Sequence, residues 1–222
     1  MNSVELNKKF WKSVTPKSLV HLSDMAALEA SQAEGRGLNG MDYSIKEILS
    51  VVEKDQLCEW LVFELFNPSQ TLYLVVKCVG DDVDLRMFYN PESIVVGNRQ
   101  DQINNQNVFM FENYKPHSHN NLLGLKYTSQ VNWTFDYGNG PEEVVFNQKG
   151  NMELTGDASY SPARNRNDQY VATISEYLAE KETPEPEIMI IEVGSAVNKK
   201  GGSILLLVGN PINEFEISIV RK

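Results

Sequence analysis

Three neighbouring runs decide the fold that the sequence predicts: EWLVFEL at residues 59–65, TLYLVVK at 71–77 and VDLRMFY at 83–89. Each run is rich in β-branched and aromatic residues, which are favoured in strands. The turn-forming segment Asn67-Pro68 separates the first two runs, and glycine with two aspartates separates the last two. We therefore expect an antiparallel meander in this part of the chain.

A second set of runs, between residues 170 and 220, follows the order of residues 43–89 at an offset of roughly 127–129 residues. Each set has a strand-like run bracketed by glutamates and a later Val-Gly pair, before an acidic and apolar alternation. Antiparallel meanders resemble one another, so true duplication and generic similarity both explain the pattern. Duplication predicts two related β units that share one core.

Residues 168–180 and their counterpart at 45–52 are ambiguous between strand and helix. In the later segment Val171, Ile174 and Leu178 lie at helical spacing, whereas the repeat predicts a strand. Ser23 is a candidate N-cap of a further helix, which residues 24–33 would form and Gly35 would end.

The expected fold class is therefore α+β and dominated by β-structure. It has short N-terminal helices followed by mainly antiparallel sheet in two halves. We expect four segments within one compact domain: helical residues 1–40, a first β unit at 41–92, polar loops and middle strands at 93–167, and a second β unit at 168–222.

Composition excludes some classes of protein. The 222 residues include 20 Lys+Arg and 30 Asp+Glu, which give a net charge of −10 at pH 7. A nucleic-acid partner is not expected, because phosphate binding needs clustered cations. No apolar run reaches the ~18 residues of a membrane span, and residues 1–16 lack the apolar segment of a secretion signal. Cys58 and Cys78 are interpreted as reduced core thiols of a cytoplasmic protein.

His117 and His119 are the candidate metal ligands. In extended backbone, residues two apart project to the same face, so both imidazoles could bind one metal ion. Glu112 or Asp136 would have to supply a carboxylate ligand. The flanking proline and asparagines instead indicate an exposed loop with solvated histidines.

Two short basic segments are candidates for contact with an anion or an acidic partner. Arg164 and Arg166 form one, since guanidinium groups suit carboxylate and phosphate. Lys8, Lys9 and Lys12 form the other. The N-terminal segment is interpreted either as a helix that packs its aromatic residues on its own domain, or as an interfacial membrane or partner-docking helix.

The bracketing glutamates are Glu59 and Glu64 in the first set, and Glu187 and Glu192 in the second. Paired carboxylates are the groups that hydrolyse glycosides. However, residues five apart on a strand point to opposite faces, so neither pair converges from its own strand. Solvated strand ends or protection of a sheet edge explain them more simply.

No phosphate-binding glycine-rich loop, nucleophile elbow or CxxC pair occurs, so the sequence does not favour an enzyme. The leading hypothesis is a cytoplasmic accessory module, without a cofactor, that binds a protein partner or a second copy through a sheet edge or polar loops. One alternative is a metal- or ligand-binding protein, or an enzyme of another type, that uses His117 and His119. A second is a peripheral membrane component anchored by the basic N-terminal segment.

Overall fold

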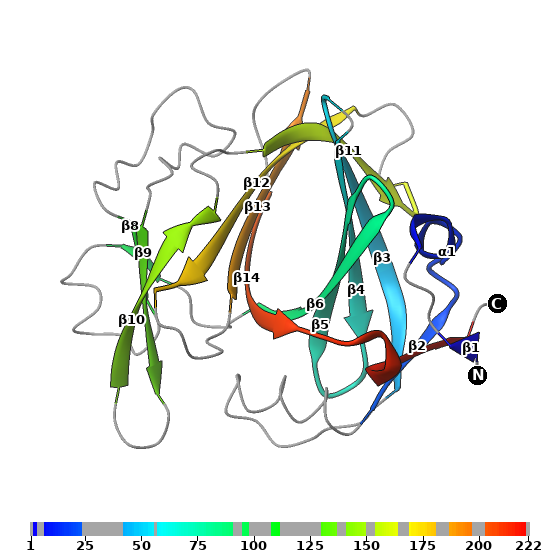
Figure 1. Ribbon diagram of the computed structural model, residues 1–222, viewed down its shortest axis with the longest axis horizontal. Coiled ribbons are helices and arrows are strands. Elements are labelled where there is room, and N and C mark those ends of the chain that lie inside the picture. The colour runs from blue at the N-terminus through cyan, green and yellow to red at the C-terminus, as the bar shows by residue number, and fades with distance from the viewer. Residues whose placement is uncertain are drawn as a thin grey trace. The chain divides into compact units, whose positions relative to one another are not determined.

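The computed structural model describes residues 2–3, 7–23, 42–55, 57–90, 95–97, 108–111, 130–136, 141–149, 154–163, 169–180, 187–196 and 203–220. Almost all the secondary structure in these residues is β-strand, with one five-residue α-helix and a 3-10 turn (Figure 1). The expected α+β class is therefore wrong, because the chain is nearly all β. The helix expected at residues 23–33 lies almost wholly outside the described residues.

The strands form one antiparallel barrel with additional strands. The barrel closes through eight strands in the order β3-β4-β5-β6-β14-β13-β12-β11. Closure removes exposed strand edges, which otherwise invite association. Its strands are β3 (Asp42–Glu53), β4 (Cys58–Phe66), β5 (Thr71–Val79), β6 (Asp82–Tyr89), β11 (Leu154–Ser161), β12 (Tyr170–Ala179), β13 (Glu187–Ser195) and β14 (Ser203–Pro211).

Two compact units divide the chain. The first contains Met1–Asn90, Thr155–Ala172 and Gly209–Lys222, and the second contains Pro91–Leu154 and Thr173–Val208. Besides its barrel strands, the first unit has β1 (Asn2–Ser3), α1 (Lys8–Lys12), β2 (Leu19–Leu22), the 3-10 turn η2 (Glu214–Glu216) and β15 (Ile217–Val220). The second has β7 (Val95–Gly97), β8 (Val108–Phe111), β9 (Gln130–Asp136) and β10 (Pro141–Gln148).

The predicted meander is confirmed: β3, β4, β5 and β6 pair successively and antiparallel. Local chemistry fixes the β4–β5 turn, where the Asn67 side-chain oxygen accepts the backbone N–H groups of Ser69 and Gln70, each at 2.9 Å. Gly80 supplies the positive φ of 61° that the β5–β6 turn requires.

The ambiguous residues 168–180 contain a strand, β12, and their counterpart lies in strand β3. Four consecutive residues of β12, from Ala172 to Ser175, are buried. A strand buried on both faces loses the alternation that identifies it in a sequence. β12, β13 and β14 match β3, β4 and β5 in order, but β15 pairs with β1 and β2. Duplication stays a prediction.

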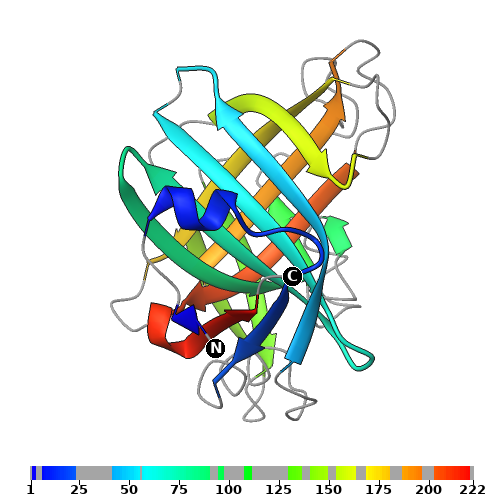
Figure 2. The ribbon, with the colours of Figure 1, turned by 90° about the vertical axis from the view of Figure 1, so that its right-hand side faces the viewer.

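Both faces of the meander carry buried side chains, and one of them packs against α1. Residues directly opposite one another on paired strands share a face. Phe63, Leu74 and Met87 are opposite one another in this way, and all three are buried. Helix α1 lies across this sheet (Figure 2), and its Trp11 ring centroid is 5.8 Å from that of Phe63. The packing of the N-terminal aromatic residues on their own domain is therefore confirmed.

Neither of the two cysteines forms a disulfide bond. Cys58 is opposite Val79, whereas Cys78 is opposite Glu59 on the same pair of strands. Adjacent positions on a strand project to opposite faces, so this register directs the two thiols to opposite sides of the sheet.

Candidate interaction surface

The N-terminal lysines bind a buried carboxylate in the same unit. Lys8 Nζ lies 2.9 Å from Glu59 Oε2, and Lys12 Nζ lies 2.8 Å from the same oxygen. Glu59 is only 4% exposed, so its interpretation as a solvated strand end is wrong. A buried carboxylate needs such partners, since an unpaired charge is costly to remove from water. Two of the three candidate lysines thus hold α1 on the sheet, while Lys9 is exposed.

The contact with Glu59 also changes the pKa of Lys8. The hydrogen bond to Glu59 raises the pKa of Lys8 above its ordinary value of 10.5. On the same face, burial raises the pKa of the Cys78 thiol, with the Glu59 carboxylate as a further cause. Cys78 is therefore kept as an unreactive thiol at neutral pH.

Replacing Glu59→Gln should lower the free energy of unfolding by about 1–3 kcal/mol, since the amide keeps the shape but leaves both lysines without their anion. The Lys8 contribution is complete below pH 10.5 and is lost as pH rises through its raised pKa. Urea unfolding of wild type and variant should therefore give a difference that narrows above about pH 10.5.

Glu64→Gln on the same strand is the matched control. Its ion pair is with Lys46, whose side chain is 65% exposed, so we expect a loss below about 1 kcal/mol. Equal losses for the two variants, or a difference that does not change with alkaline pH, would contradict a stabilising role for the Glu59 cluster.

Most of the other sequence-predicted site residues cannot be placed. His117, His119, Glu112, Arg164 and Arg166 lie outside the described residues, so the metal site and the arginine contact stay predictions. Asp136 ends strand β9. Among the residues that the structure describes, no group of three or more His, Cys, Asp or Glu side chains is arranged to hold a metal ion.

The structure does bring together a row of exposed side chains that the sequence does not reveal. Successive pairings place Val220 opposite Leu19, Leu19 opposite Ser44, and Ser44 opposite Phe66. These residues share one face of β15, β2, β3 and β4, at neighbouring positions about 4.8 Å apart. Val220, Leu19 and Phe66 are 40%, 38% and 45% exposed. We call these four residues the Phe66 row.

A histidine–carboxylate hydrogen bond and an ion pair flank the Phe66 row on the same strands. His21 Nδ1 lies 2.7 Å from Asp42 Oδ1, and Lys46 Nζ lies 2.6 Å from Glu64 Oε1. Near Glu64, burial raises the pKa of Tyr73 to about 12, so its hydroxyl stays protonated at neutral pH. The row is thus a mostly apolar strip with polar and charged side chains beside it, as in the apolar centre and polar rim of protein interfaces.

Comparisons with known proteins match the chain to no family model, no curated protein and no solved structure. In the described part of the chain, no helix is long and apolar enough to cross a membrane. Function is therefore inferred from the chemistry of the described surface.

Proposed function

We propose that this chain is a non-enzymatic module that binds another protein through the Phe66 row. The observation that carries the proposal is the row itself: three large apolar side chains lie exposed on one face of four adjacent strands, with only the small Ser44 between Leu19 and Phe66. Single exposed apolar residues are common on monomers, but contiguous ones mark interaction sites.

The chemistry of the row favours a partner that presents an apolar strip without a strong charge of its own. Glu64 is already paired with Lys46, and the 86% exposed Asp42 carboxylate is hydrogen-bonded to His21, so neither requires an opposite charge from a partner. A second copy is disfavoured as that partner, because two chains of net charge −10 repel each other.

Packing does not favour the membrane-anchor alternative, because the side chains of Phe10 and Trp11 on α1 are buried in the chain's own core. A cytoplasmic location is part of the proposal, supported by two cysteines that form no disulfide bond.

The proposal predicts that a photo-crosslinking phenylalanine analogue at position 66 captures a protein in cells that express the full chain. Adding Leu19→Ser to the same chain should reduce the adduct at least about fivefold, since the row loses one of its apolar contacts. Stability should fall by less than about 2 kcal/mol, because Leu19 is already 38% exposed.

The matched control places the analogue at Leu57, an exposed residue outside the row. Capture at position 57 of the same protein with equal yield, or an adduct that Leu19→Ser leaves unchanged, would refute the proposal. An adduct made of two copies of this chain would show that the row is instead a self-association surface.

A further inference from the structure

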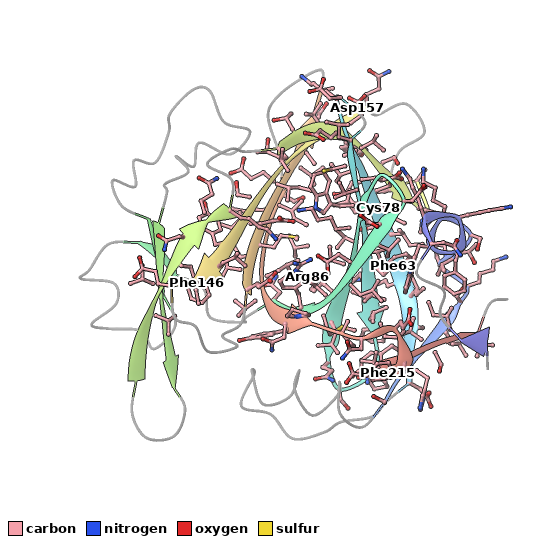
Figure 3. All side chains as sticks on the ribbon, viewed as in Figure 1. Phe63, Cys78, Arg86, Phe146, Asp157 and Phe215 are labelled. Carbon is pink, nitrogen blue, oxygen red and sulfur yellow. The ribbon has the colours of Figure 1, made fainter. Side chains whose placement is uncertain are left out.

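A second exposed feature of the first unit is the aromatic ring of Phe215, in the turn η2 (Figure 3). Phe215 is 80% exposed, more than any other large hydrophobic residue in the described part of the chain. Leaving a phenylalanine in water forgoes the favourable free energy of burying its ring. The exposed ring is therefore a candidate contact for another molecule.

The turn that carries Phe215 is held on both sides by buried anchors. Ile212 is buried, and its backbone N–H donates to the Leu85 carbonyl oxygen at 3.1 Å. Ile217 is buried as well, and the Glu216 carbonyl oxygen accepts the Ser23 N–H at 2.8 Å. Phe215 thus lies between two points at which the chain is fixed to the core of its unit.

A capping box also orders the turn internally. The Asn213 N–H donates to Glu216 Oε2 at 2.8 Å, and the Glu216 N–H donates to the Asn213 carbonyl oxygen at 3.1 Å. Such an ordered turn loses little conformational entropy when its side chain binds a partner. Exposure on a rigid turn therefore suits an anchor residue better than exposure on a loosely held segment would.

We propose that Phe215 is an anchor that inserts into an apolar pocket of a partner protein whose rim carries lysine or arginine. The ring provides the apolar contact, and aromatic anchors of this kind are frequent binding hot spots. The neighbouring Glu214 and Glu216 select a basic rim by charge complementarity. The same two carboxylates oppose contact with an anionic lipid surface.

This inference rests on the proposed function, because it takes the partner to be a protein, but it concerns side chains outside the Phe66 row. The test uses the full chain and the protein captured by the photo-crosslinking analogue at position 66 or at position 215. Phe215→Ala should weaken binding of that captured protein about 10- to 30-fold, whereas Phe215→Tyr should stay within about threefold.

Charge reversal tests the basic rim. Glu214→Lys should weaken binding at least about fivefold at low salt, and the effect should shrink at high salt. Glu216 is left intact in this test because it closes the capping box. Binding to vesicles of neutral and anionic phospholipid tests whether Phe215 contacts a membrane surface instead of a protein.

The outcomes separate the two proposals. Three results would each contradict the proposal that Phe215 anchors a partner protein. They are unchanged binding of Phe215→Ala, tighter binding of Glu214→Lys, and Phe215-dependent binding to the vesicles. If variants of the Phe66 row weaken binding while Phe215→Ala does not, the anchor fails and the proposed function stands. Failure of both positions to capture any protein would refute both.

Discussion

Gly209→Ala is expected to destabilise the chain by more than about 3 kcal/mol, the largest effect of a single methyl group that the structure predicts. A Cβ at position 209 would lie 1.9 Å from the Met87 carbonyl oxygen and 2.7 Å from the Phe88 Cα. Both are backbone atoms of β6, so no side-chain rotation relieves the clash. Denaturant unfolding followed by circular dichroism measures the loss, and failure to fold is the extreme form of the same result.

The glycine in the β5–β6 turn is the matched control. Gly80 has φ of 61°, and a Cβ there would meet no atom within 4 Å. Gly80→Ala should therefore cost only about 1–2 kcal/mol, which is the backbone strain of a non-glycine residue in this conformation. Equal losses at the two positions would show that β6 can move away from Gly209.

The meander could be predicted because its determinants are local. Dense β-branched and aromatic residues mark β4 to β6, and Asn67 and Gly80 mark the turns in the sequence itself. The strand at β12 could not be separated from a helix, since the burial of Ala172 to Ser175 on both faces removes the alternation. Pairing with neighbouring strands, and not a local alternation, decides that segment.

Neither the buried Glu59 nor the Phe66 row could be predicted, because both depend on contacts between distant parts of the sequence. In the sequence Glu59 resembles a solvated strand end. Only the structure shows that Lys8 and Lys12 form ion pairs with it. Phe66 directly follows the run predicted at residues 59–65 and ends the observed strand β4. Its alignment with Leu19 and Val220 depends on the registers of β2 and β15, which no local pattern encodes.

Trp11→Ala should lower the free energy of unfolding by about 3–5 kcal/mol, because it leaves a large cavity where α1 packs on the meander. Trp11 is 1% exposed and is in ring contact with Phe10 and Phe63, at centroid distances of 5.3 and 5.8 Å. Loss of this contact should also free α1, so the Lys8 and Lys12 ion pairs with Glu59 should weaken together with it.

Trp11→Phe distinguishes packing from polar contact at the same position. The Trp11 Nε1 is buried and has no hydrogen-bond partner among the described residues, so the indole contributes to stability through its apolar bulk. Phenylalanine should therefore retain most of the stability, with a loss below about 2 kcal/mol, measured by thermal and urea unfolding. Phe215→Ala, at an exposed ring, should change stability by less than about 0.5 kcal/mol. If Trp11→Ala also lowered the free energy of unfolding by less than about 0.5 kcal/mol, α1 would not be part of the core, because truncating a buried indole costs several times more.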